Sequence, residues 1–182
     1  MARFLVFLRA INLGPTRKFP KADIVASTVG AGFADVETHI ASGNVRVDTA
    51  MRSRTKIETA LEKAYAADRG FEVPCIAFSV AEFLEIAAQA EELNAARPGL
   101  ARHYVYLLKA EPSREDIARV EGTSGALGEM VVRGRAAHAL LQPGYADGKV
   151  DPLNAAKLLG VATNRNVTVV RTLAQKWCGP GS

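Results

Sequence analysis

The sequence predicts an α+β fold of two packed split-βαβ (ferredoxin-like) halves, each with an antiparallel sheet and helices on one face. Apolar patterns in the first half change between strand and helix periods in the order β-α-β-β-α-β, which defines this arrangement. After a stretch containing Pro98-Gly99, the second half opens with β-α-β-β-α. We therefore expect a first half over residues 1–90, a linker over 91–102 and a second half over 103–182.

The first strand is expected at the start of the stretch Phe4–Gly14, which reads FLVFLRAINLG. Its first five residues are apolar on both faces of a strand, a pattern typical of a sheet that is covered on both sides. The strand then leads into two polar side chains, Arg9 and Asn12. A helix follows over about Lys21–Val29, where apolar residues recur at helical spacing before glycines end the pattern.

A hairpin and a second helix complete the first half. Strands over Phe33–Ile40 and Asn44–Asp48 flank the turn residues Ser42-Gly43. The next helix carries an apolar stripe and ends at Gly70, and a strand over Phe71–Phe78 follows. Because Pro74 removes one hydrogen-bond donor, we expect this strand at an edge of the sheet.

The second half repeats this order. Ser79 and Glu82 form a capping box for a helix that precedes the linker. The elements beyond the linker are a strand (His103–Lys109), a helix capped by Ser113, a hairpin across Gly134-Arg135 and a short helix from Asp151-Pro152 to Gly160. The last element could be a strand over the β-branched Val167–Val170 or a helix that Asn166 caps, and we choose the helix because its apolar residues share one helical face.

Split-βαβ topology places the end of the first strand and the hairpin turn at the same end of the sheet. We therefore expect Arg9 and Asn12 to approach Ser42, Gly43 and Asn44. An arginine beside amide and hydroxyl donors suits the binding of a phosphate or a carboxylate. The alternative is structural, because turns and caps use the same residue types.

Composition indicates a folded protein with ordinary surface chemistry. The chain of 182 residues is 48% hydrophobic and 23% charged, and its net charge of +4 favours anionic partners without requiring them. The apolar run at the start is too short for a membrane span or a signal-peptide core, so we expect a cytoplasmic protein without membrane partners. Two distant cysteines give no disulfide framework.

No complete catalytic or metal-binding signature occurs in the sequence. A P-loop, a dinucleotide-binding glycine motif, HExxH and a nucleophile elbow around Ser42 are all missing, so we predict no cofactor. The three histidines, His39, His103 and His138, lie on or beside different expected strands without a ligand partner at suitable spacing, and we predict no metal site.

Three motifs resemble one family: FLRAINLG at the front, THIASGNVRV in the first hairpin and ATNRNVTVVRTLA near the end. They are similar to LLRGINVGG, TYIQSGNVVF and TxRNxxT in the bacterial family called domain of unknown function 1697 (DUF1697), and the resemblance extends over essentially the whole chain. Two family positions with glycine hold Ala10 and Pro15 here, and those with tyrosine and glutamine hold His39 and Ala41. The resemblance implies no activity, since the family has no established function.

Position by position, the resemblance implies ten polar or glycine motif residues. They are Arg9, Asn12, Gly14, Ser42, Gly43, Asn44, Thr163, Arg165, Asn166 and Thr168.

We expect a small anionic ligand at Arg9, Asn12, Ser42, Gly43 and Asn44, completed by Arg165 and Asn166 if these meet the first cluster. A helix starting near Asn166 would add free backbone N–H groups to such a site. The alternative is a nucleic-acid-binding accessory protein that uses Arg52, Arg54 and Lys56. An enzyme of unassigned reaction also stays open, because no base or nucleophile is identifiable.

Overall fold

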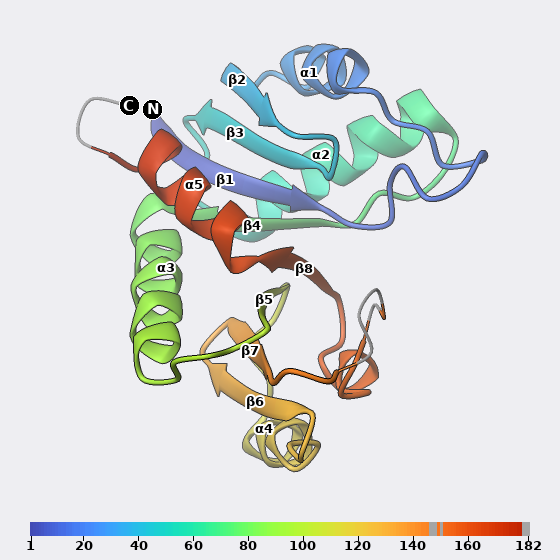
Figure 1. Cartoon of the computed structure of the whole chain (residues 1–182). Coiled ribbons are helices and arrows are strands. Elements are labelled where there is room, and N and C mark those ends of the chain that lie inside the picture. The colour runs from blue at the N-terminus through green and yellow to red at the C-terminus, as the bar shows by residue number, and fades with distance from the viewer. Residues whose placement is uncertain (146–148, 150, 180–182) are drawn as a thin grey trace. The chain divides into compact units, whose positions relative to one another are not determined.

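The computed structural model of the chain describes residues 1–145, 149 and 151–179 (Figure 1). The chain forms two compact units, Met1–Phe83 (unit 1) and Leu84–Ser182 (unit 2), and each is described here by itself. No helix in the described ranges has the length and apolar character that crossing a bilayer requires.

Unit 1 contains one four-stranded antiparallel sheet in the order β2-β3-β1-β4. This is the split-βαβ order, as predicted. Its helices α1 and α2 contribute to one core with the face of β1 that carries Phe4, Val6 and Leu8. The elements are β1 (Ala2–Leu8), α1 (Lys21–Gly30), β2 (Ala34–His39), β3 (Asn44–Thr49), α2 (Arg54–Arg69) and β4 (Cys75–Ser79).

The opposite face of β1 is also buried, because Leu5 and Phe7 have no exposed surface. The ring of Phe7 stacks on Phe83 of α3 (Val80–Ala95), with centroids 5.4 Å apart. The continuous apolar run at the front of the sequence is thus explained by burial on both faces of this central strand.

The edge strand β4 is protected by carboxylates of α2. Glu62 accepts a hydrogen bond from the backbone N–H of Cys75, and Glu58 accepts one from Ala77, both at 2.9 Å. Unpaired N–H groups of an edge strand would otherwise be open to pairing with another chain. The edge position predicted from Pro74, which directly precedes β4, is confirmed.

The division between the units differs from the predicted linker over residues 91–102. It follows Phe83, and α3 starts with the predicted capping box of Ser79 and Glu82. The helix continues to Ala95, so residues 91–95 extend it. Glutamates, leucine and alanine in this stretch are good helix formers, and the helix stops before Pro98.

Unit 2 repeats the strand arrangement in the order β6-β7-β5-β8. Its elements are β5 (Arg102–Leu108), α4 (Arg114–Glu121), β6 (Gly128–Arg133), β7 (Ala136–Leu141), the 3-10 helix η1 (Ala156–Leu158), β8 (Ala162–Asn166) and α5 (Val167–Trp177). The caps at Ser113 and Asn166 and the hairpin across Gly134-Arg135 are confirmed.

Two expectations for the second half are wrong. The predicted short helix from Asp151 to Gly160 is a loop that contains only the 3-10 turn η1. The Asp151 carboxylate accepts hydrogen bonds from the backbone N–H groups of Ala155 and Ala156 in this loop. Strand β8 was not predicted. Its sequence ATNRN is short and polar and lacks alternation, so only pairing with β5 reveals it.

The carboxylate of Glu58 offers a test of the edge protection. It is buried, so Glu58→Ala leaves the N–H of Ala77 without this acceptor, and we expect a loss of about 1–3 kcal/mol in the free energy of unfolding. Glu58→Gln keeps a side-chain oxygen and should lose less. Urea unfolding measures both, and equal losses would contradict the role of this hydrogen bond.

Candidate functional site

The loop after β1 and the turn between β2 and β3 meet at one end of the sheet of unit 1. The backbone N–H of Leu8 donates to the carbonyl of Gly43 at 2.8 Å. Gly43 has φ of 77°, and a Cβ there would lie 2.8 Å from the Cβ of Leu8. Only glycine fits this left-handed, crowded position, which explains the SGN motif.

Asn12 ties the two loops together through its whole amide. Its Nδ2 donates to the carbonyls of Ala41 at 2.9 Å and Phe19 at 3.2 Å, and its Oδ1 accepts from the N–H of Phe19 at 2.9 Å. The predicted approach of Asn12 to the hairpin turn is therefore observed. These bonds give the amide a structural role, as in the alternative interpretation.

Asn44 also supports the turn from inside. It is fully buried, and its Nδ2 donates to the carbonyl of His39 at 2.9 Å and to the hydroxyl of Ser42 at 3.1 Å. Ser42 itself is exposed. Asn44 thus holds the turn that presents Ser42.

Arg9 follows β1 directly and is exposed. Its backbone N–H donates to the carbonyl of Pro74 at 2.9 Å, which fixes the point where the side chain leaves the sheet. Within the described residues its guanidinium makes no ion pair. Arg9 is therefore the predicted ligand-binding residue of unit 1 that offers a full positive charge to an anion.

The two predicted residues of the last motif have different surroundings. Arg165 on β8 is only 6% exposed, and its Nη1 donates to the hydroxyl of Thr163 at 2.8 Å and the carbonyl of Asn164 at 2.7 Å. Burial lowers its pKa to about 10. Asn166 caps α5: its Oδ1 accepts from both the N–H and the hydroxyl of Thr168, at 2.9 Å each.

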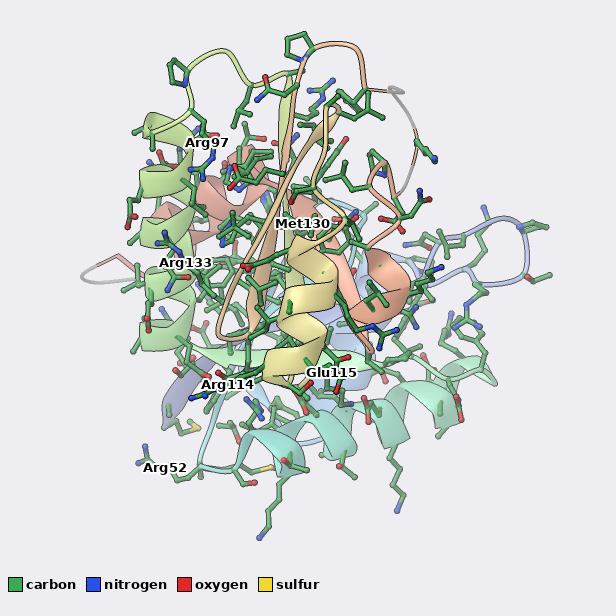
Figure 2. The ribbon with its side chains drawn as sticks, turned by 90° about the horizontal axis from the view of Figure 1, so that it is seen from below. Arg52, Arg97, Arg114, Glu115, Met130 and Arg133 are labelled. Atoms are coloured by element: carbon green, nitrogen blue, oxygen red, sulfur yellow. The ribbon has the colours of Figure 1, made fainter. Side chains whose placement is uncertain are left out.

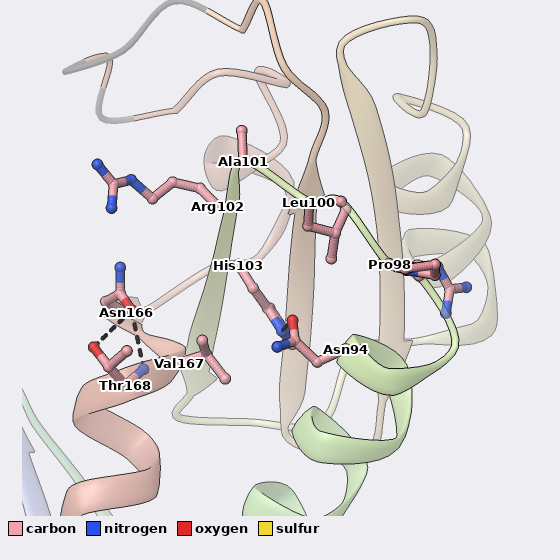
Figure 3. A pocket seen from close by; sticks show the side chains of 11 residues that line it. Asn94, Pro98, Leu100, Ala101, Arg102, His103, Asn166, Val167 and Thr168 are labelled. Carbon is pink, nitrogen blue, oxygen red and sulfur yellow. Dashed lines mark hydrogen bonds between the residues drawn. The ribbon is translucent and has the colours of Figure 1, made fainter.

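A pocket of about 290 Å³ opens beside Asn166 in unit 2 (Figure 3). It lies between the end of α3, the start of β5 and the N-terminus of α5. Its polar lining residues are Asn94, Arg97, Arg102, His103, Asn166 and Thr168. The pocket thus includes one predicted site residue, and Arg165 is outside its lining.

Two arginines and a helix N-terminus bring positive charge to this pocket. The guanidinium of Arg97 forms a two-point ion pair with Glu129, at 2.7 and 3.0 Å, which neutralises most of its charge. Arg102 is exposed, and its Nε donates to the hydroxyl of Tyr145 at 3.2 Å. The dipole of α5 adds partial positive charge at its N-terminus. Arg102 and the start of α5 can together hold an anion.

A buried pair of histidines lies under the pocket. Nδ1 of His103 is 3.0 Å from Oδ1 of Asn94, and its Nε2 is 3.0 Å from Nδ1 of His138. Since the Asn94 oxygen only accepts, His103 carries its proton on Nδ1 and accepts from His138. Burial lowers the pKa of His103 to about 4 and that of His138 to about 3, so both rings are neutral near pH 7.

Sequence reasoning placed these histidines on separate strands and missed their contact. β5 pairs with β7 so that His103 lies opposite Leu140 and Val105 opposite His138. The two histidines are therefore diagonal neighbours on one face of the sheet. No turn joins β5 to β7 directly, so this register has no local signal in the sequence. Within the described part of the chain, no group of three potential metal ligands gathers.

A sequence model described as "Protein of unknown function (DUF1697)" matches residues 1–138. The chain belongs to the DUF1697 family. The resemblance seen in the motifs is thus confirmed, although the match to the DUF1697 family ends before the last motif at Thr163. It includes the loops around Arg9 and Ser42 and both buried histidines.

Among solved structures, the conserved bacterial protein SP0830 from Streptococcus pneumoniae is similar over 96% of this chain and 97% of its own, with a TM-score of 0.71 and 22% identity. This likeness shows the fold of the DUF1697 chain. No curated protein matches the sequence.

The buried histidines predict a loss of stability in mild acid. Their folded-state pKa values lie below the ordinary value of 6.5, so the unfolded chain binds more protons as the pH falls from about 6.5 towards 4. The stabilisation from the neutral histidines is fully present well above pH 6.5. By pH 5, each histidine should lower the free energy of unfolding by about 2 kcal/mol.

Urea unfolding of wild type and His138→Gln at pH 7.5 and pH 5 measures this effect. The variant should show a smaller difference between the two pH values, whatever its absolute stability. His39→Gln, which leaves the buried pair intact, is the matched control and should keep the wild-type difference. An unchanged pH dependence in His138→Gln would contradict the assignment.

Proposed function

We propose that this protein binds a small anionic ligand, bearing a phosphate or a carboxylate, in the pocket at the start of α5. The observation that carries this proposal is the meeting of Arg102 with the capped N-terminus of α5 in one hollow of about 290 Å³. The predicted ligand-binding residue Asn166 lies in the same hollow.

The chemistry of a helix N-terminus supports an anion at this place. The first N–H groups of a helix have no intrahelical acceptor. Within the described residues, the Asn166 side chain accepts from Thr168 alone among them, so the neighbouring N–H groups at the start of α5 can donate to a ligand. A negative charge there also gains from the dipole of this eleven-residue helix.

Arg102 supplies the full charge that the backbone groups lack. Its guanidinium is exposed at the pocket, whereas the neighbouring Arg97 is only partly exposed and is held by Glu129. Guanidinium groups bind phosphate and carboxylate oxygens at two points, which favours such ligands over halide ions.

No reaction is assigned to the pocket. His103 is the lining residue whose side-chain type most often acts as a general base, but both of its ring nitrogens are engaged with Asn94 and His138. A general base must reach the proton it removes, and this ring is turned inward. The proposal is therefore binding without an assigned chemical step.

The end of the unit 1 sheet at Arg9 and Ser42–Asn44 remains a predicted binding place for the same class of ligand. The exposed guanidinium of Arg9 supports it. Asn12 and Asn44 contribute there by holding the loops, because their amides already bind the protein backbone.

The two places are separated by thermal shift measurements with nucleotides, sugar phosphates and carboxylates. A ligand at about one hundred times its Kd should stabilise the protein by about 2.7 kcal/mol, which raises Tm by several degrees. Arg102→Ala should abolish this shift. Arg114→Ala removes an exposed arginine of α4 (Figure 2) and should keep it.

Arg9→Ala completes the set. A shift that Arg102→Ala keeps and Arg9→Ala loses would move the ligand to the edge of unit 1 and contradict the pocket assignment. A shift that all three variants keep would contradict both.

A further inference from the structure

One segment of unit 1 carries several cations and no acidic residue. Residues 9–21 contain Arg9, Arg17, Lys18 and Lys21 and no acidic residue. The 23 lysines and arginines of the chain exceed its 19 aspartates and glutamates by four, the number found in this segment. Outside this segment, basic and acidic residues are equal in number, at 19 each.

These four cations are not neutralised within the described residues, where none of them forms an ion pair. Arginines elsewhere commonly do: Arg3 pairs with Asp48, and Arg46 with Glu37, at 2.9–3.0 Å. Arg17 makes hydrogen bonds only to the carbonyls of Ala10 and Glu72, and its guanidinium lies 4.6 Å from the ring centre of Phe71. It thus keeps its net charge.

The segment is held in a fixed shape. Arg17 and the amide of Asn12 pin it to its surroundings, and Asn12 joins it to the turn at Ala41. Three non-glycine residues in the joined loops, Ala10, Asn12 and Ile40, have φ between 50° and 59°. Such left-handed backbone costs energy and is concentrated at functional sites. Cations on a fixed loop also lose less conformational entropy on binding.

Two large apolar side chains are exposed on the same joined loops. Leu13 is 60% exposed and Ile40 is 41% exposed. Their chain neighbours Asn12 and Ala41 are joined by a hydrogen bond of 2.9 Å. We call Arg9, Leu13, Arg17, Lys18, Lys21 and Ile40 the basic loop surface.

We propose that the basic loop surface binds single-stranded nucleic acid, with its cations on phosphates and Leu13 and Ile40 against unstacked bases. A single strand offers both negative charge and accessible base faces, whereas a duplex hides those faces. Two isolated apolar side chains bury little area, which favours a nucleic acid over a lipid surface. This proposal is independent of the pocket in unit 2.

Fluorescence anisotropy with labelled 20-mers of deoxythymidine and uridine tests the proposal between 50 and 300 mM salt. Each phosphate contact on a single strand contributes about −0.7 to the slope of log K against log salt, so four contacts predict about −3. The double variant Arg9→Ala/Lys18→Ala should reduce that slope by about 1.4 and weaken binding at least tenfold.

The matched control removes two cations from another part of unit 1. Arg52→Ala/Lys56→Ala has the same change in net charge and removes two cations of the alternative nucleic-acid surface expected from the sequence, so it separates the two surfaces; the side chain of Arg52 points away from the ribbon (Figure 2). It should change affinity less than twofold. Leu13→Ser should reduce the preference for single strands over a duplex of equal length. Circular dichroism confirms the fold, and Lys18→Glu/Lys21→Glu provides a second loop variant.

Four results would overturn the proposal. Both double alanine variants could lose affinity equally, which would mean diffuse charge, or the 20-mers could fail to bind at 50 mM salt. Mononucleotides could bind as tightly as 20-mers, which would indicate a small-ligand site. Vesicles of anionic phospholipid could bind more tightly than the 20-mers through the same loop residues, which would indicate a membrane surface.

Discussion

The close approach of the hairpin turn to the end of β1 determines the geometry of unit 1. The carbonyl of Gly43 reaches the N–H of Leu8 at 2.8 Å, a distance that a Cβ at Gly43 would prevent. This contact sets the register between β1 and β3 and brings Ala41 within reach of Asn12. Arg9 and the basic loop leave the sheet from this fixed point.

The same backbone framework recurs in unit 2 with different side chains. There the N–H of Leu108 donates to the carbonyl of Arg135 at 3.0 Å, and Lys109 donates to Val161 as Arg9 does to Pro74. The central strands therefore correspond with an offset of one hundred residues, and Ser79 and Asn166 occupy equivalent capping positions. One framework thus supports a fixed basic loop in unit 1 and a pocket at a helix start in unit 2.

The sequence was sufficient for features set by local chemistry. The capping box at Ser79, the caps at Ser113 and Asn166, and the edge strand after Pro74 all follow from single residues with strong conformational preferences. The approach of Asn12 to the hairpin turn followed from topology alone. These features needed no knowledge of side-chain packing.

Features that depend on the register between distant strands could not be predicted from the sequence. Strand β8 has no alternating pattern, and it exists because β5 pairs with it. The contact of His103 with His138 depends on the β5–β7 register. The pocket forms where the end of α3, the start of β5 and the start of α5 meet. The structural role of Asn12 and Asn44 in holding loops could not be predicted either, because an asparagine that binds a ligand and one that binds backbone look the same in a sequence.

A comparison of Gly43→Ala with Gly134→Ala tests this account most directly. Both glycines have left-handed backbone, with φ of 77° and 56°, but a Cβ at Gly134 would meet nothing within 4 Å. Both variants should therefore lose about 1–3 kcal/mol in the free energy of unfolding from backbone strain, and Gly43→Ala should lose clearly more through its clash with Leu8. Equal losses in urea unfolding would contradict the claim that the close approach at Gly43 organises this edge.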